Sequence, residues 1–186
     1  RLSKEQLEAW THPLGQEQLI VRAHGTWVAP PVVERGIMVE ELSHAARRAP
    51  DPIRHAIEAD GLSDAEQKLA GLNVAFHQDD LAIQVAPGLA AQSPLRLVRL
   101  FAVSSHQAIF PLTVITVGEG SVLTLIDEYV SADSTGSPEP HLINNRIELI
   151  LEPNARVHYV RLQRWAPTAR EFAFQRATLG AGAQLT

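Results

Sequence analysis

Apolar and polar residues follow two different rhythms along this chain of 186 residues, and the rhythm changes near residue 80. Before that point, apolar residues recur every three or four positions, which is typical of helices with one buried face. After it, short β-branched and apolar runs follow one another without helical spacing, which is typical of strands. The pattern predicts a small, mostly helical α/β amino-terminal region over residues 1–80 and a mainly β region over residues 81–186.

The first region contains signals for several helices and one hairpin. Capping-box sequences at Ser3 and Ser63 predict helices over 4–10 and after residue 63. Asp51 followed by Pro52 predicts another helix, with the aspartate as its N-cap. The remaining expectations are a hairpin turning at His24-Gly25, a helix near 39–48, and a helical apolar face of Leu69, Leu72 and Phe76.

The second region reads as a series of strands that end in similar corners. The strands are expected at 81–85, 95–100, 110–117, 122–130, 146–151, 157–165 and 172–179. Corners with a Gly or Asn follow at Pro87-Gly88, Glu119-Gly120, Pro153-Asn154 and Ala181-Gly182. Gly and Asn tolerate the left-handed backbone of a tight corner. A repeat of about 30 residues is typical of stacked arrays, so the sequence predicts a β-solenoid.

Two further expectations concern the ends of this array. The segment Ser131 to His141 is rich in Ser, Pro and Gly and is predicted to be a loop. The last residues resemble a corner followed by the start of a strand, so we expect a truncated solenoid with an open edge. An open edge favours pairing with another β-solenoid, including a homodimer.

Composition narrows the classes of protein. With 45% hydrophobic and 20% charged residues, the chain resembles an ordinary folded domain. It contains no cysteine, which excludes disulfides, cysteine nucleophiles and thiolate ligation by this chain. A net charge of −5 argues against nucleic-acid binding, which needs a basic surface patch or stripe. No apolar run approaches the roughly 18 residues of a membrane helix, and no signal peptide is recognised, so a cytoplasmic location is expected.

The stretch Gly118-Glu119-Gly120 could be a phosphate-binding loop or a simple corner. A dinucleotide fingerprint needs a third glycine and a helix directly after it, and a P-loop needs Lys followed by Ser or Thr. A β-branched, apolar run from Val122 to Ile126 follows instead. The corner is therefore the preferred interpretation.

Histidines and carboxylates offer weaker candidates. His77 with Asp79 and Asp80 could supply metal ligands from one turn, although a helix end running into a strand explains the same residues. His158 and Tyr159 alternate on a strand, so one of them is expected to face inward. Because no set of ligands or nucleophiles converges, no catalytic, cofactor-binding or metal residue is assigned.

One enzymatic alternative stays open. Glu119, Asp127 and Glu128 could supply the carboxylate pair of a β-solenoid carbohydrate-active enzyme, although solvated surface acids are the simpler interpretation. Another alternative, a cupin-like β-sandwich, would need clustered His and Glu ligands that the sequence does not supply. Arg161, Arg164 and Arg170 with Trp165 are interpreted as a contact surface.

Several stretches resemble the SufB/SufD family, and SufD-type members most closely. The segment LAGLNVAFHQDDLAIQVAPGL, from Leu69 to Leu89, is similar to the helix end, Asp turn and first strand of that family. LTVITVGEGSVLTLIDEYVS, from Leu112 to Ser131, is similar to its G-E-G-(S/A) corner and acidic–aromatic strand. The resemblance is colinear over residues 19–186, and the absence of cysteine fits SufD better than SufB.

The resemblance implies a right-handed parallel β-helix and a role in iron–sulfur cluster assembly. It implies a non-enzymatic scaffold subunit that works with a SufB-like β-helical paralogue and the SufC ATPase, which hydrolyses ATP. The cluster would be carried transiently by the full complex. No cluster ligand is carried over to this chain, because the matching positions are expected beyond Thr186.

Overall fold

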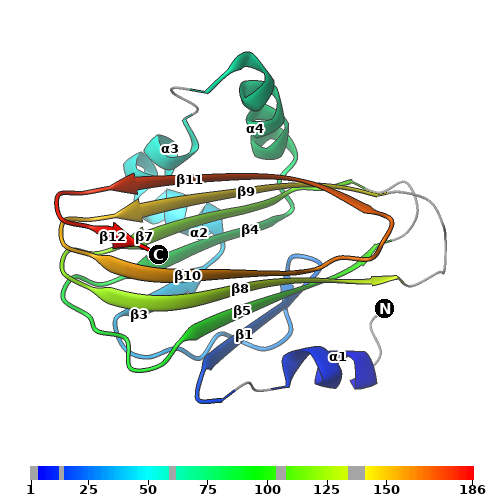
Figure 1. Ribbon diagram of the computed structural model, residues 1–186, viewed down its shortest axis with the longest axis horizontal. Coiled ribbons are helices and arrows are strands. Elements are labelled where there is room, and N and C mark those ends of the chain that lie inside the picture. Colours follow the sequence, from blue (N-terminus) through cyan, green and yellow to red (C-terminus); the bar gives the residue numbers. More distant parts are fainter. Residues whose placement is uncertain (1–3, 13–14, 59–61, 104–107, 134–140) are drawn as a thin grey trace.

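The computed structural model describes residues 4–12, 15–58, 62–103, 108–133 and 141–186. Within them the chain is mainly β, with helices packed outside two sheets (Figure 1). The helices are α1 (Lys4–Thr11), α2 (Leu42–Arg48), α3 (Pro50–Ile57) and α4 (Asp64–Phe76). The strands are β1 (Gln18–Ala23), β2 (Thr26–Trp27), β3 (Ile37–Glu40), β4 (Asp79–Val85), β5 (Leu95–Val103), β6 (Ala108–Ile109), β7 (Pro111–Val117), β8 (Val122–Asp133), β9 (His141–Leu151), β10 (Arg156–Arg164), β11 (Ala169–Leu179) and β12 (Gln184–Leu185).

The strands form two sheets that face each other. Sheet A has the order β12-β10-β8-β5-β1-β2, and sheet B has the order β11-β9-β7-β4-β3, with β6 also paired to β9. From β4 onward, apart from the short β6, successive strands alternate between the sheets. From β5 onward each of them pairs in parallel with the strand of the preceding turn of the chain. The only antiparallel pairs in the described chain are β1–β2 and β3–β4. The amino-terminal strands therefore complete one edge of each sheet.

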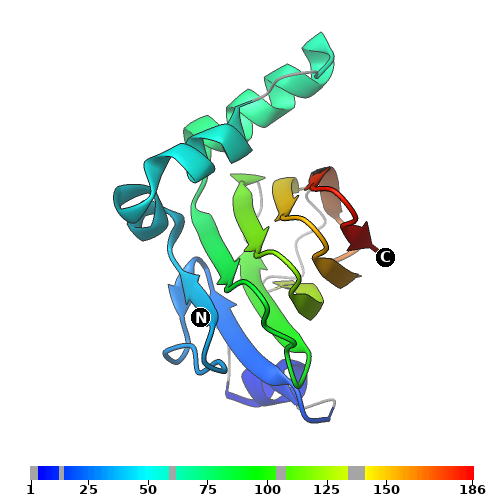
Figure 2. The same cartoon turned by 90° about the vertical axis from the view of Figure 1, so that its left-hand side faces the viewer.

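The corners predicted from the sequence are confirmed, and they lie directly above one another (Figure 2). The backbone φ angle is positive at Gly88, Gly120, Asn154 and Gly182, with values between 60° and 72°. The amide of Gly88 donates to the carbonyl of Glu119 at 2.8 Å, and that of Gly120 to Pro153 at 2.9 Å. These bonds satisfy backbone groups that a corner would otherwise leave without partners.

The space between the sheets near the corners is filled by aliphatic side chains. Leu81 and Ile83 of β4 meet Leu95 and Leu97 of β5, and all four are fully buried. Equivalent positions of the later strands extend this core along the stack: Ile115, Leu123, Leu125, Ile147, Leu149 and Val157. Each fully buried Leu or Ile contributes about 1.5–3 kcal/mol. Along β5, Leu95 and Leu97 face this core, whereas Arg96 lies on the outer face of sheet A.

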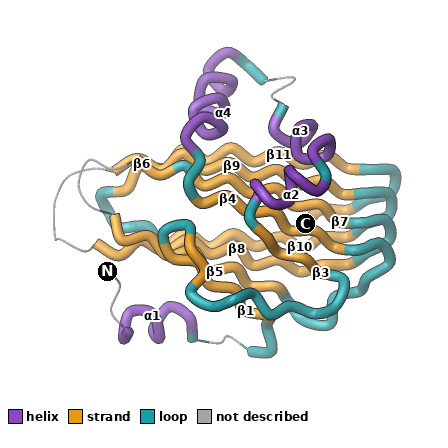
Figure 3. The backbone as a smooth tube through the Cα atoms, turned by 180° about the vertical axis from the view of Figure 1, so that it is seen from behind, coloured by secondary structure: helices purple, strands orange, loops and turns teal. Residues whose placement is uncertain are grey.

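Helices cover the outer faces of the sheets. In Figure 3, α2, α3 and α4 lie across the outer face of sheet B. Helix α1 lies on the side of sheet A, where Arg96 of β5 donates to the carbonyl of His12 just after the helix. None of the described helices is long and apolar enough to cross a membrane.

Most amino-terminal expectations are confirmed, including α1, the hairpin at His24-Gly25 and the capping box of α4. In that box Ser63 and Glu66 satisfy each other's backbone amides. The helix predicted near 39–48 is wrong at its start. Ile37 and Val39 instead form β3, because both face the core at strand spacing. The predicted cap at Asp51 is also wrong, since α3 begins two residues earlier, at Pro50, with Ala49 as N-cap.

The predicted apolar face of α4 is only partly buried. Leu72 and Phe76 are 45% and 57% exposed, whereas Asn73 is fully buried. The Asn73 amide donates to the carbonyls of Pro111 and Asn144 at 2.9 and 2.7 Å, so these bonds orient the helix with a polar residue inward. The predicted loop from Ser131 to His141 begins later, since residues 131–133 belong to β8 and His141 to β9. The rest of it lies outside the described residues.

Candidate functional site

Between the sheets, at the end away from the corners, polar side chains replace the aliphatic core. We name this group the interior polar cluster. It comprises Arg22, Asp79, Arg99, Thr113, Asp127, Tyr129, Asn145, Tyr159, Arg161 and Glu171. They come from β1, β4, β5, β7, β8, β9, β10 and β11, so the cluster crosses every layer of the stack. Its three arginines are balanced by three carboxylates.

Asp127 is the centre of the cluster. Its Oδ2 accepts hydrogen bonds from the hydroxyls of Tyr129 at 2.8 Å and Tyr159 at 2.9 Å. Its Oδ1 lies 3.6 Å from Nη2 of Arg99, which also donates to Thr113. Burial raises the pKa of both tyrosines far above the ordinary value, and the neighbouring Asp127 carboxylate raises it further. Both hydroxyls are therefore held as neutral donors to a buried carboxylate.

The other two carboxylates of the cluster are held in the same way. Glu171 accepts from Trp165 Nε1 at 2.8 Å, from Asn145 at 3.3 Å and from Arg161. Asp79 Oδ1 accepts from Nε of Arg22 at 2.7 Å. Buried ion pairs of this kind contribute little net stability, but removing one partner leaves a costly uncompensated charge. The cluster therefore favours one register of the strands, rather than offering a free acid or base.

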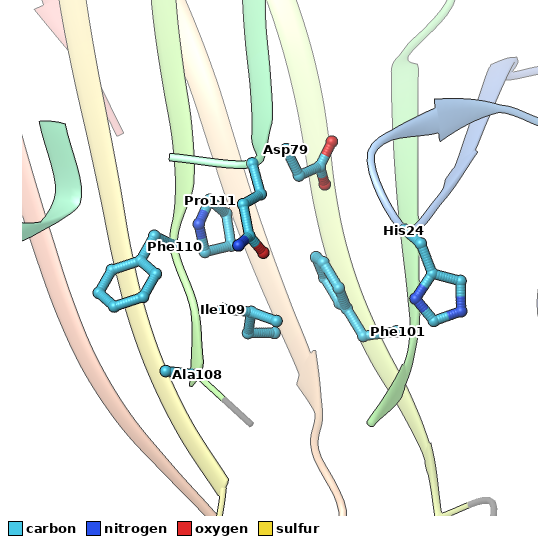
Figure 4. Close-up of a pocket in the computed structure, with 8 residues that line it drawn as sticks. His24, Asp79, Phe101, Ala108, Ile109, Phe110 and Pro111 are labelled. Carbon is cyan, nitrogen blue, oxygen red and sulfur yellow. The ribbon is translucent and has the colours of Figure 1, made fainter. Parts of the chain in front are cut away.

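A cavity of about 300 Å³ adjoins the cluster at Asp79 (Figure 4). His24, Gln78, Phe101 and Ile109 also line it. Burial is the main cause that holds the pKa of His24 below its ordinary value. Asp79 Oδ2 has no hydrogen-bond partner among the described residues. The cavity thus combines one buried carboxylate oxygen with an apolar wall, and within the described chain no group of three potential metal-ligating side chains was found.

The structure corrects the positions expected for the candidate carboxylates. Asp127 and Glu128 are 1% and 0% exposed, so they are not solvated surface acids. Glu128 lies on the outer face of sheet A, where Oε2 accepts from Arg96 at 2.7 Å and Oε1 lies 3.1 Å from Arg164. Glu119 is exposed at a corner. The three carboxylates occupy the interior, an outer face and a corner, and do not share a groove.

The other sequence candidates also separate in space. Asp79 faces the interior, while Asp80 pairs with His77 at 3.3 Å outside it, so these residues form no common metal site. Tyr159 is the inward member of its pair and His158 is exposed. The proposed contact surface of arginines is divided. Arg161 pairs with Glu171 inside, and Arg164 pairs with Glu128 on the outer face.

Gly118-Glu119-Gly120 is a corner, as preferred from the sequence, and Gly118 has no room for a side chain. A Cβ there would lie 2.5 Å from the backbone nitrogen of Pro87 in the preceding corner. Arg22, Arg99 and Glu171 were missed by sequence reasoning. For Arg22 and Arg99 the signal is a charged residue within a largely apolar strand. The partner of Arg22 is Asp79 on the facing sheet, and that of Arg99 is Asp127 on the adjacent strand.

The comparisons with known proteins agree with this arrangement. Residues 100–186, which include the end of β5 and all later strands, match a family described as SUF system FeS cluster assembly, SufBD core domain. Over this segment the chain is similar to the SufB/SufD family. The match covers most, but not all, of the part of the chain in which parallel strands alternate between the sheets, since β4 and the first half of β5 precede it.

A curated relative extends the similarity beyond that segment. The iron-sulfur cluster assembly protein SufD of Bacillus subtilis (strain 168) is 25% identical over 126 residues. The aligned part covers 68% of this chain and 28% of the relative. The chain therefore spans less than a third of the length of that relative.

Proposed function

We propose that this chain acts as a SufD-type scaffold subunit in iron–sulfur cluster assembly. The observation that carries the proposal is the match of residues 100–186 to the SufBD core domain. The similarity to a SufD protein favours the SufD type within the family. The absence of cysteine fits the same assignment, because the chain then supplies no thiolate for a cluster.

The proposal includes the architecture of the core. We propose that residues 81–186 are the first coils of a right-handed parallel β-helix, supported by the alternation of strands between the sheets and by the stacked corners. Strands β11 and β12 lie at one edge of the two sheets. A SufB-like β-helical paralogue that pairs with this edge would satisfy the free backbone groups there, and a second copy of the chain is the alternative partner.

The chain is proposed to have no enzymatic activity of its own. ATP hydrolysis would belong to a SufC-type ABC ATPase, and the cluster would be cargo of the assembled complex in the cytoplasm. The binding of Asp127, Glu128 and Glu171 by other side chains of the chain supports this view, since each is held by arginines or by hydrogen-bond donors. Because Glu119, Asp127 and Glu128 do not share a groove, they do not supply the carboxylate pair that the carbohydrate-active alternative requires.

Affinity capture tests the assignment. The tagged full-length protein, expressed at its native level, is expected to retain an ABC-type ATPase and a β-helical paralogue from its own lysate. Deleting its gene is expected to lower the activity of iron–sulfur enzymes in the same cells. If neither protein is retained and cluster-dependent activities are unchanged, the scaffold assignment is wrong. An ATPase or hydrolase activity of the purified chain alone would contradict its non-enzymatic role.

A further inference from the structure

The cavity beside Asp79 lies between the sheets, at the end away from the corners, and we name it the Asp79 cavity. Its volume of about 300 Å³ is at the lower end of the range for small-molecule sites. Asp79 and Phe101, which line it, are buried, whereas His24, Gln78 and Ala108 are exposed where the cavity opens. A ligand of a few heavy atoms can therefore enter from solvent and reach buried groups.

The other fully buried carboxylates of the described chain have a donor or a cation near each oxygen. Glu148 accepts a 2.7 Å hydrogen bond from a different arginine at each oxygen. In Glu128, Oε2 accepts from one arginine at 2.7 Å and Oε1 lies 3.1 Å from a second. Asp127 has two tyrosine hydroxyls at Oδ2 and an arginine 3.6 Å from Oδ1. Two of these three carboxylates are thus each held by a pair of guanidinium groups.

Asp79 departs from this pattern. Its Oδ1 accepts from Nε of Arg22 at 2.7 Å, but its Oδ2 has no hydrogen-bond partner among the described residues. Nη2 of Arg22 donates to the carbonyl of Gly25, and Cζ of Arg22 lies 4.3 Å from the ring centroid of Trp27. These contacts fix the guanidinium, so Nη2 does not close a bidentate pair with Asp79. A buried carboxylate oxygen without a donor is costly, and a ligand that supplies one relieves that cost.

The wall of the cavity favours a cation with an apolar stem. Among its described lining residues, Asp79 is the only one with an acidic side chain, and none is Lys or Arg. Burial holds the pKa of His24 below its ordinary value, so this side chain is neutral at neutral pH. In Figure 4, Phe101 and Ile109 lie below Asp79 and provide apolar surface. An aromatic wall attracts cations, and a guanidinium is less strongly hydrated than an ammonium group and stacks on aromatic faces.

We propose that the Asp79 cavity binds an alkylguanidinium group. The guanidinium donates to Oδ2 of Asp79, and the alkyl stem contacts Phe101 and Ile109. Asp79 then has a second guanidinium partner, as Glu128 and Glu148 do. A free alkylguanidine and an arginine side chain of another protein present this same chemistry. The inference rests on the cavity alone and is independent of the proposed role in cluster assembly.

Titration with matched small molecules tests the proposal. The probes are butylguanidinium and butylurea, its neutral isostere, added to the isotope-labelled full chain while amide chemical shifts are followed by NMR. Butylguanidinium is expected to bind at least about tenfold more tightly, with shifts concentrated around His24, Gln78 and Phe110. A blocked Gly-Arg-Gly peptide distinguishes the two sources. Binding equal to that of butylguanidinium assigns the site to an arginine side chain, and much weaker binding assigns it to a free small cation.

Variants locate the binding. Asp79→Asn removes the charge at nearly constant shape and is expected to weaken binding about tenfold or more. Ala108→Trp fills the mouth without touching the pair of Asp79 and Arg22, and it is expected to weaken binding to a similar extent. The matched controls are Asp80→Asn, outside the cavity, and Ala181→Trp, exposed in a corner at the other end of the strands. Both should bind as the wild type does.

Unchanged thermal midpoints establish that the variants fold, and Ala108→Trp decides the matter if Asp79→Asn does not fold. The proposal is overturned if butylguanidinium does not bind or binds no more tightly than butylurea. It is also overturned if the shifts lie elsewhere in the chain, or if Ala108→Trp binds as tightly as the wild type.

Discussion

The hydroxyl of Tyr159 on β10 donates a 2.9 Å hydrogen bond to the carboxylate of Asp127 on the neighbouring strand β8. Tyr159→Phe is expected to lower the free energy of unfolding by about 1 kcal/mol, because one buried hydrogen bond is lost. Asp127→Ala is expected to lower it by about 3–5 kcal/mol, because Arg99 would remain buried without its counter-charge. Urea unfolding followed by circular dichroism measures both values.

His158→Ala serves as the control for these two variants. This side chain is exposed on the same strand, and its loss is expected to change stability by less than about 0.5 kcal/mol. Equal losses in Asp127→Ala and Tyr159→Phe would contradict the central position of Asp127 in the interior polar cluster.

Alkaline titration should report on the same cluster. The chain has two tyrosines, Tyr129 and Tyr159, and burial raises the pKa of both in the folded state. Below about pH 10 both the folded and the unfolded chain keep these protons, so stability does not depend on them. Above that pH only the unfolded chain releases them, and the free energy of unfolding falls by up to about 1.4 kcal/mol per pH unit for each tyrosine.

Absorbance at the tyrosinate band measures this effect. The native protein is expected to show no tyrosinate signal until it unfolds, whereas the protein in concentrated urea titrates near the ordinary pKa of tyrosine. The corresponding single Tyr→Phe variants should each remove half of the signal. A native protein that ionises one tyrosine reversibly near pH 10 would show that this side chain reaches solvent.

Two glycines give opposite predictions for the same substitution. Gly118→Ala would bring a Cβ within 2.5–2.8 Å of backbone atoms of Pro87 and Val85, so the stacked corners must separate. A loss of more than about 2 kcal/mol is expected. Gly71→Ala lies inside α4 with nothing within 4 Å, and it should stabilise the protein by about 0.5–1 kcal/mol. Thermal unfolding of both variants checks the sign of each change; a tolerated Gly118→Ala would mean that the corners are not in tight contact.

Helix α3 depends on two arginines from sheet B. Arg146 donates to the carbonyl of Ile57 and Arg176 to that of Ala56, while Glu148 holds both guanidiniums at 2.7 Å. A helix of eight residues is not stable in isolation. Arg176→Met is therefore expected to increase hydrogen exchange in α3 about tenfold without a comparable change in the strands.

Arg170→Met is the matched control for that measurement, because Arg170 is exposed and lies on the same strand β11. It should leave exchange in α3 unchanged. A uniform increase of exchange throughout the protein in Arg176→Met would point to a global rather than a local role.

The strands and corners could be predicted from the sequence because both are local properties. Short β-branched runs and single Gly or Asn residues at corners depend on few neighbours, and Asn154 was found by the same rule as Gly120. The partners of the charged residues could not be predicted in the same way. Arg96 and Glu128 are 32 residues apart, and only the register of β5 against β8 brings their side chains together.

The orientation of α4 shows a second limit of prediction from the sequence. Its apolar residues at helical spacing indicated a buried face, yet Asn73 determines which side is inward through carbonyl groups of two strands. Hydrogen bonds to backbone atoms far along the chain leave no periodic signal. Asp127 and Glu128 were expected in solvent for a different reason: the side chains that bind them come from neighbouring strands, and the sequence alone does not bring those strands together.

The two sheets are closed at one edge by β2 and β3, strands of only two and four residues that run antiparallel to their neighbours. Such short, reversed strands expose few unpaired amides and carbonyls, and they do not continue the parallel register. The parallel register instead continues as far as β11 and β12 at the opposite edge. The two edges of the array therefore differ in kind, and the array has a polarity.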